Sequence, residues 1–141
     1  MNLYVDTSVL LRVVLNEPGV LREWKNSRRW ISSQLIRTEC LRTIDRARVQ
    51  FSLPDEDVAD RRAAVLDHLR AFDLIIVDTT ILERAADPFP TAVGTLDALH
   101  LASAVAARAV TPDLVFATHD HELGVAARAI GFRVLGVPGL K

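Results

Sequence analysis

The chain has 141 residues, half of them hydrophobic and a quarter charged, with a formal net charge of −1. This length suits one globular domain spanning residues 1–141, and the composition excludes a disordered chain. The near-neutral charge also excludes a protein that holds nucleic acid mainly through its overall charge.

Short apolar runs alternate along the chain with longer segments of helical periodicity. The run at 72–77 is continuously apolar from Leu74, which is typical of a buried parallel strand. The alternation predicts an α/β domain with three layers, α/β/α, and a mostly parallel central sheet. In chain order we predict a strand at 2–5, helices at 8–15 and 20–26, a strand at 30–32, helices at 34–50 and 54–68, a strand at 72–77, helices at 80–86 and 94–110, a strand at 114–117, a helix at 120–130 and a strand at 133–137.

Cysteine use and hydropathy predict the compartment. Cys40 is the single cysteine, so it has no partner for an intramolecular disulfide, and we expect the reducing environment of the cytoplasm. The longest apolar stretches, 9–15 and 98–110, are interrupted by charged or polar residues, so we expect no membrane span. We also expect no targeting segment at the start, where Asp6 follows only a short apolar run.

The charges are unevenly distributed. Residues 1–50 carry nine Lys and Arg against five acids, whereas residues 51–141 carry eight against thirteen. A basic N-terminal third could offer a surface to a phosphate backbone. Solvated helix faces explain the same excess, so charge alone leaves both interpretations open.

Four acidic residues lie on or beside apolar segments: Asp6, Glu39, Asp97 and Asp120. Asp6 follows the first predicted strand and Asp120 the fourth, and the carboxyl ends of parallel strands form one crevice. Glu39 and Asp97 share the apolar stripes of their helices. All four can therefore meet in one cleft, and such a set of oxygen ligands suits Mg²⁺ or Mn²⁺.

Each acid also has a local explanation. Asp6 and Asp120 stand where N-caps are expected, and one residue can both cap a helix and bind a ligand. Glu39 could pair with Arg37 or Arg42. Asp97 could cap its helix or form a salt bridge near its start. Capping and pairing explain the acids singly, but not why all four should point to one place.

Several other residues have simple structural interpretations. His100 is expected to be a packed or surface histidine, and Cys40 a core residue. Trp24 and Trp30 are expected to pack rather than to stack on bases. His119 and His121 flank Asp120, but no second cluster of His or Cys completes a zinc site.

Four segments resemble the motifs of PIN-domain ribonucleases, and their order resembles the VapC toxins of bacterial toxin–antitoxin pairs. They are Tyr4-Val5-Asp6-Thr7-Ser8-Val9-Leu10-Leu11, Ser33-Gln34-Leu35-Ile36-Arg37-Thr38-Glu39, Gly94-Thr95-Leu96-Asp97-Ala98-Leu99-His100-Leu101-Ala102-Ser103-Ala104 and Thr118-His119-Asp120-His121-Glu122-Leu123. The resemblance covers essentially the whole chain. One departure is His119, which replaces an aromatic residue, often Tyr, before the last acid.

The resemblance implies a PIN-like fold and a catalytic quartet of Asp6, Glu39, Asp97 and Asp120. It implies Mg²⁺ or Mn²⁺ bound directly by Asp6 and Asp97. Glu39 would bind directly or through water, and Asp120 would complete the site or hold a second metal. Two further groups are expected to support the site: Thr7 or Ser8 beside the first acid, and the basic residues Arg12, Arg22, Arg28 and Arg29 along an approach for RNA.

The resemblance also implies an activity and partners. We expect an endoribonuclease that cuts structured tRNA, rRNA or mRNA and inhibits translation and growth until a VapB-like antitoxin binds. We expect a homodimer and larger toxin–antitoxin assemblies, with contacts through the first helices and 54–68. The alternatives are a PIN nuclease for RNA processing or DNA cleavage without an antitoxin, and a catalytically silent module that binds RNA or a partner.

The sequence lacks the motifs that several other enzyme classes require. A dehalogenase-type phosphatase needs a second aspartate two residues after the first, but Asp6 is followed by Thr7 and Ser8. A response receiver needs an acidic pair at the first strand end and a lysine on a late strand. A P-loop enzyme needs a glycine-rich loop with lysine, and none of these features occurs here.

Overall fold

A computed structural model describes residues 1–140. The first half of the chain forms β1 (Asn2–Val5), α1 (Thr7–Val14), a 3₁₀ turn (Trp24–Asn26), β2 (Arg29–Ser33), α2 (Leu35–Phe51) and α3 (Asp55–Leu69). The second half forms β3 (Phe72–Ile75), α4 (Thr79–Ala86), α5 (Thr95–Val110), β4 (Leu114–Ala117), α6 (His121–Ala129) and β5 (Val134–Leu135).

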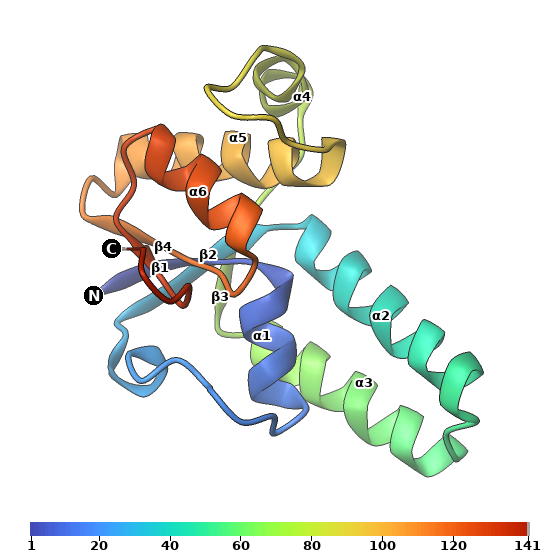
Figure 1. The fold of residues 1–141 in the computed structure, drawn as a ribbon. Helices are drawn as coiled ribbons and strands as arrows, with labels where there is room; N and C mark the ends of the chain where they lie inside the picture. The colour runs from blue at the N-terminus through green and yellow to red at the C-terminus, as the bar shows by residue number, and fades with distance from the viewer. Residues whose placement is uncertain (141) are drawn as a thin grey trace.

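The strands form one sheet in the order β3-β2-β1-β4-β5, and every neighbouring pair is parallel. Parallel neighbours require crossover connections, which the helices provide. Figure 1 shows α1, α2 and α3 on one side of the sheet and α5 and α6 on the other, with α4 beside α5. The predicted three-layer α/β/α fold is confirmed, and the sheet is entirely parallel.

The side chains of β1 and β4 alternate between two cores. Leu3 and Val5 face the core formed with α1, α2 and α3, whereas Tyr4 faces the core formed with α5 and α6. In β4, Val115 belongs to the first core and Phe116 to the second. These two central strands are therefore buried on both faces, which fixes their register and the positions of the residues that follow them.

Three helices begin at an aspartate that follows a strand. The side chains of Asp6, Asp78 and Asp120 accept a hydrogen bond from the backbone N–H of Val9, Ile81 and Leu123 respectively. Each bond satisfies a helix N–H that has no partner within the helix. The predicted capping by Asp6 and Asp120 is therefore correct.

Helices α2 and α3 form a hairpin whose apolar faces pack against each other and against α1. Ser52, with φ of 51°, ends α2 in the left-handed conformation, and Pro54 precedes α3. Val65 and Leu69 of α3 lie in the core shared with α1 and α2. The expectation that 54–68 and the first helices contact a partner stays a prediction, and part of their apolar surface packs within the chain.

The 72–77 prediction is wrong in length and in burial. Strand β3 ends at Ile75 and lies at the edge of the sheet. Leu74 is 37% exposed and Ile76 is 68% exposed. The run is apolar in sequence, but only one side of β3 has a neighbouring strand, so the burial expected of a central strand does not occur.

Two predicted elements, the helix at 20–26 and the strand at 133–137, are shorter in the structure, and a glycine lies in or beside each. The helix expected at 20–26 is reduced to the 3₁₀ turn Trp24–Asn26, after Gly19 turns the chain with φ of 83°. Leu21 and Trp24 still bury their side chains and anchor this loop. The last strand stops at Leu135, because Gly136 adopts φ of 99°.

Within residues 1–140, no helix combines the length and the hydropathy that crossing a bilayer requires.

Gly136→Ala is expected to destabilise the protein by about 3 kcal/mol, because two costs add. A β-carbon at this position would lie 2.3 Å from the carbonyl oxygen of Thr118, and φ is positive. Positive φ costs about 1–2 kcal/mol for a residue with a β-carbon, and overpacking adds about 1–3 kcal/mol.

Gly139→Ala is the matched control, because φ is 81° but no atom lies within 4 Å of its β-carbon position. Urea unfolding of both variants separates the steric cost from the backbone cost. Equal losses of unfolding free energy in the two variants would show that the close approach to Thr118 does not contribute.

Candidate active site

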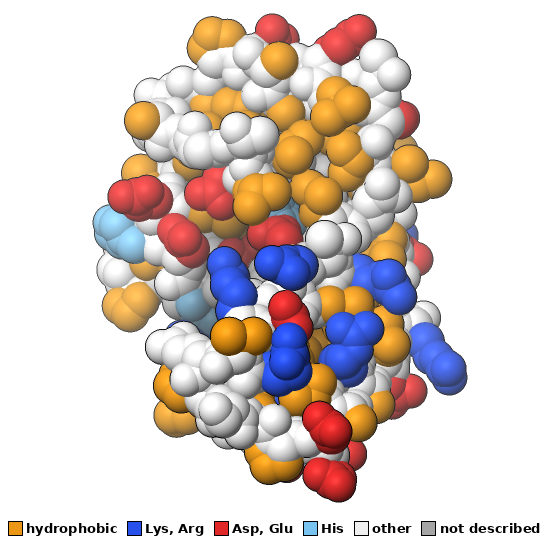
Figure 2. Space-filling view, turned by 90° about the vertical axis from the view of Figure 1, so that its right-hand side faces the viewer, with side chains coloured by type: hydrophobic (Ala, Val, Ile, Leu, Met, Phe, Trp, Pro, Cys, Tyr) orange, Lys and Arg blue, Asp and Glu red, His pale blue; other side chains and the backbone are white. Residues whose placement is uncertain are grey.

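The four acids predicted from sequence line one pocket at the carboxyl edge of the sheet. The pocket has a volume of about 250 Å³ and is lined by Asp6, Thr7, Ser8, Leu11, Glu39, Asp97, His100, Asp120 and Leu123. Two of the acids follow central strands, and the other two come from α2 and α5 on opposite sides of the sheet. Figure 2 shows acidic side chains gathered in the middle of one face, between an apolar area and a group of Lys and Arg side chains.

Asp6 is the most buried of the four acids, with 5% of its surface exposed. Its Oδ1 accepts hydrogen bonds from Ser8 Oγ at 2.6 Å and from the N–H of Val9 at 3.2 Å, and its Oδ2 accepts from Thr118 Oγ1 at 2.6 Å. Burial raises the pKa of Asp6 in spite of these hydrogen bonds. The protein therefore holds this carboxylate rigidly in a place where its charge is poorly solvated.

Ser8 and Thr118 connect the first acid to the last. Ser8 Oγ donates to Asp6 and accepts from the backbone N–H of His119 at 2.9 Å. Thr118 Oγ1 donates to Asp6 and accepts from the backbone N–H of Asp120 at 3.0 Å. Of the two hydroxyl residues considered beside Asp6, Ser8 makes this contact, whereas Thr7 Oγ1 is buried without a hydrogen-bond partner in residues 1–140.

Thr118 was not among the predicted site residues. Its position in the sequence could have indicated it, because Thr118 directly follows β4 just as Asp6 directly follows β1. The two strands pair in parallel with Val5 opposite Ala117, which brings the next residue of each together.

Glu39 is held by His100 rather than by an arginine. His100 Nε2 lies 2.5 Å from Glu39 Oε1, and His100 Nδ1 lies 2.9 Å from the Tyr4 hydroxyl. The alternative of a pairing with Arg37 or Arg42 does not hold: Arg42 lies 3.5 Å from Asp45, and Arg37 forms no ion pair within residues 1–140. The interpretation of His100 as a packed histidine is correct for its burial, but it missed this contact.

The neighbours of His100 define its donors. Tyr4 Oη accepts a hydrogen bond from the backbone N–H of Ser33, and burial raises the pKa of the Tyr4 hydroxyl. The hydroxyl therefore keeps its proton and shares a hydrogen bond with His100 Nδ1. A carboxylate oxygen only accepts hydrogen bonds, so we assign His100 Nε2 as the donor to Glu39.

Asp97 and Asp120 complete the pocket. Asp97 stands in the first turn of α5, which begins after Gly94 and so does not use Asp97 as its N-cap. Burial raises the pKa of Asp97, and the negative charges of Asp120, Asp6 and Glu39 raise it further. The acids are thus close enough to repel one another, which is the electrostatic condition expected of a cation site.

Several carboxylate oxygens already have protein donors. The described residues contain no three acidic, His or Cys side chains whose present positions could hold one ion together. Asp6, Glu39 and Asp120 each direct at least one oxygen to a hydroxyl, an imidazole or a backbone N–H. The site is a shared acidic pocket whose side chains are positioned by their donors, not a closed cage of ligands.

The basic residues predicted to line an RNA approach separate into two pairs. Arg12 and Arg22 line a cleft next to the acidic pocket. Arg28 and Arg29 lie at the beginning of β2, which is the opposite edge of the sheet from the acids, and Arg29 is paired with Asp73 at 2.7 Å. The structure does not bring Arg28 and Arg29 to the site.

The sequence that forms this site is similar to those of known proteins. A family model for the PIN domain matches residues 3–129. The chain belongs to the PIN-domain family. Its four acids, from four separate elements of a parallel α/β fold, are thus part of a PIN domain.

This PIN domain is similar over nearly its whole length to three proteins of Mycobacterium tuberculosis. It is 34% identical to Ribonuclease VapC35 of strain H37Rv over 142 residues, which cover 97% of each chain. It is 32% identical to Ribonuclease VapC46 of the same strain, with 94% of this chain and 95% of that protein covered. It is 30% identical to Ribonuclease VapC47 of strain CDC 1551, with 97% of each covered. The resemblance to VapC-type PIN proteins is confirmed.

Asp97→Asn is expected to stabilise the protein in the absence of divalent ions. Solvent screens the charge of this half-buried side chain, so we expect a gain of only about 0.5 kcal/mol and a rise in the thermal midpoint of roughly 2 °C. The substitution removes one charge from the repelling group. Because the pKa of Asp97 is raised in the folded state, the folded state binds protons more tightly than the unfolded state. Wild-type stability therefore falls as pH rises from the ordinary aspartate pKa to the raised one.

Scanning calorimetry in EDTA measures this effect across pH. Asp60→Asn, at an exposed position on α3, is the control and should leave the thermal midpoint unchanged. A lower midpoint for Asp97→Asn at neutral pH would show that Asp97 stabilises the metal-free fold and that repulsion is not its dominant interaction.

Proposed function

We propose that the chain is a single PIN domain that cuts RNA internally with the help of Mg²⁺ or Mn²⁺, and that it is the toxin of a toxin–antitoxin pair. The observation that carries this proposal is the common pocket of Asp6, Glu39, Asp97 and Asp120. The names of its relatives, ribonucleases of the VapC type, support RNA as the substrate.

The residues of the pocket fit a hard divalent cation. Its four acidic side chains offer only oxygen ligands, which Mg²⁺ and Mn²⁺ prefer, and a bound cation would offset the burial and the repulsion that raise the pKa of Asp97. Asp6 and Asp97 would hold the ion directly, with Glu39 binding directly or through water. Asp120, the most accessible of the four, would complete the site or hold a second ion.

The bound ion would lower the pKa of a water molecule and neutralise charge on the phosphate under attack. The chain's own residues provide orientation. Ser8 and Thr118 fix both oxygens of Asp6, and His100 fixes Glu39 from the buried side. These contacts hold ligands in place before the substrate arrives, which reduces the reorganisation needed during the reaction.

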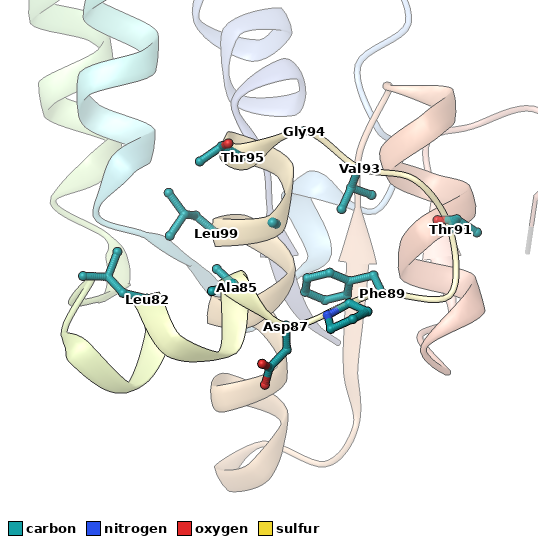
Figure 3. Close-up of a pocket in the computed structure, with 12 residues that line it drawn as sticks. Leu82, Ala85, Asp87, Phe89, Thr91, Val93, Gly94, Thr95 and Leu99 are labelled. Carbon is teal, nitrogen blue, oxygen red and sulfur yellow. The ribbon is translucent and has the colours of Figure 1, made fainter.

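The surface next to the acids supports a protein partner. Figure 3 shows the apolar groove beside α4 and the first turns of α5, lined by Leu82, Ala85, Phe89, Val93 and Leu99, with a volume of about 500 Å³. Leu82 and Leu96 are each 51% exposed nearby. We propose that a VapB-like antitoxin covers this groove and blocks the pocket, and that the toxin also forms a homodimer. Free toxin would cleave tRNA, rRNA or mRNA and thereby inhibit translation and growth.

Asp6→Asn is expected to reduce RNA cleavage by at least about 100-fold, because a neutral amide cannot hold the cation as a carboxylate does. The side-chain oxygen still caps α1, so the fold should persist. The assay follows the ends of a labelled tRNA mixture, and of a DNA with the same sequence as one substrate, in Mn²⁺.

Asp78→Asn is the matched control, because Asp78 caps α4 in the same way but does not line the pocket. It should retain wild-type cleavage. Full activity of Asp6→Asn would contradict the assignment of the site, and faster cleavage of the DNA than of the RNA would favour a DNA nuclease. Binding of RNA without cleavage by the wild type would indicate a silent module.

His100→Phe is expected to raise the Mn²⁺ concentration for half-maximal binding by about 10-fold, the scale seen when a residue that orients a metal ligand is lost. Glu39 would lose its donor and sample other rotamers. Electron paramagnetic resonance of free Mn²⁺ measures the affinity without relying on activity. An unchanged affinity in a variant whose circular dichroism matches the wild type would show that His100 does not position Glu39.

A further inference from the structure

We propose that a second cleft, lined by Arg12 and Arg22, binds a backbone phosphate of the RNA next to the one that is cut. This cleft has a volume of about 590 Å³ and is lined by Arg12, Gly19, Leu21, Arg22, Glu23, His119, Leu135, Gly136, Val137 and Pro138. The inference rests on the proposed ribonuclease function and assigns to the same substrate a binding site outside the acids.

The cleft and the acidic pocket are neighbours on two elements. On α1, Ser8 lines the acidic pocket, and Arg12 lines the cleft four residues later. Residues four apart on a helix have β-carbons about 6 Å apart and lie on the same face. After β4, His119 lines the cleft and the following residue, Asp120, lines the pocket. An RNA strand bound at the acids therefore has the cleft within reach of its adjacent nucleotide.

The two arginines have uncommitted donors. Neither Arg12 nor Arg22 forms a salt bridge within residues 1–140, although Glu23 lines the same cleft. The side chain of Arg12 makes a single hydrogen bond in that range, a long one of 3.4 Å to the carbonyl oxygen of Gly19. A guanidinium group offers several N–H donors in a planar fork that matches the oxygens of a phosphate.

His119 forms the wall between the cleft and the pocket. Its backbone N–H donates to Ser8, and its Nδ1 lies 2.9 Å from the carbonyl oxygen of Gly136. These contacts fix the ring, whose Nε2 has no hydrogen-bond partner in the described part of the chain. Gly136 leaves the room for this arrangement, because a β-carbon there would lie 3.1 Å from His119 Nδ1.

The positive charge of the cleft would offset the repulsion between the acidic pocket and an RNA backbone. The acidic pocket repels an RNA backbone, and a cation bound there offsets only part of that charge. Arg12, one helical turn from Ser8, and Arg22, in the loop that lines the same cleft, attract the adjacent phosphate and hold the strand against this repulsion. The position of the cleft also gives the strand a direction across the site, from the acids toward β5.

The test measures RNA binding separately from cleavage. A fluorescent single-stranded RNA of mixed sequence is titrated with full-length Asp6→Asn protein, in which cleavage is blocked, and anisotropy is followed as salt is varied. Adding Arg12→Gln or Arg22→Gln should weaken binding by about 5-fold to 10-fold. Each should also reduce the slope of log affinity against log salt by about 0.7, the value for one lost phosphate contact on a single strand.

Arg62→Gln, at an exposed position on α3, is the matched control and should leave affinity and slope unchanged. Arg12→Lys keeps the charge and should retain most of the slope. Because Arg22 is exposed and its side chain makes no hydrogen bond within residues 1–140, its variant tests the proposal even if Arg12→Gln disturbs the loop at Gly19.

The outcomes separate the two proposals. Wild-type affinity and slope in both glutamine variants would overturn the phosphate site, even if the otherwise wild-type protein cleaves RNA in Mn²⁺. If the two glutamine variants bound RNA as the wild type does but lost binding of the antitoxin, the phosphate site would also be overturned. The cleft would then bind an acidic peptide of the antitoxin. Arginine-dependent binding in a protein that never cleaves RNA would support the phosphate site and refute the ribonuclease.

Discussion

Parallel pairing of β1 with β4 is the constraint from which the site follows. Because Val5 lies opposite Ala117, Asp6 and Thr118 leave the sheet side by side and form the 2.6 Å hydrogen bond between them. Both strands are buried on two faces, so a slip in register by one residue would move each side chain into the opposite core, where it would not fit the neighbours packed there. The same packing that stabilises the sheet thus fixes the first acid, and the helices on either side bring Glu39 and Asp97 to it.

The acidic pocket is built at a cost in stability. Burial disfavours the ionised forms of Asp6 and Asp97 and raises the pKa of both, and neighbouring negative charges raise the pKa of Asp97 further. Packing elsewhere offsets this cost, notably the core in which α2 and α3 cover β1 and β4. A domain of this size tolerates such a site because destabilising groups are concentrated in one small pocket.

Sequence patterns predicted the features that depend on residues close together in the chain. The central strands β1 and β4, the long helices α2 and α5, and the four acids of the pocket follow from periodicity, capping and strand ends. The edge position of β3 was missed because it depends on strand order, which an apolar run does not reveal. The partners of the acids were missed for a similar reason: Glu39 and His100 are 61 residues apart, and Asp6 and Thr118 are 112 apart. Arg28 and Arg29 were misplaced because net charge does not specify a face.

The capping roles of Asp6 and Asp120 divide the quartet into two kinds of position. These two carboxylates begin helices α1 and α6, so a descendant that no longer cuts RNA would still keep them to preserve its architecture. Glu39 and Asp97 cap no helix: Glu39 is held by His100, and the charge of Asp97 is disfavoured by burial and by the other acids. Among diverging copies of this domain, the loss of Glu39 or Asp97 is therefore the substitution that would mark a pseudoenzyme.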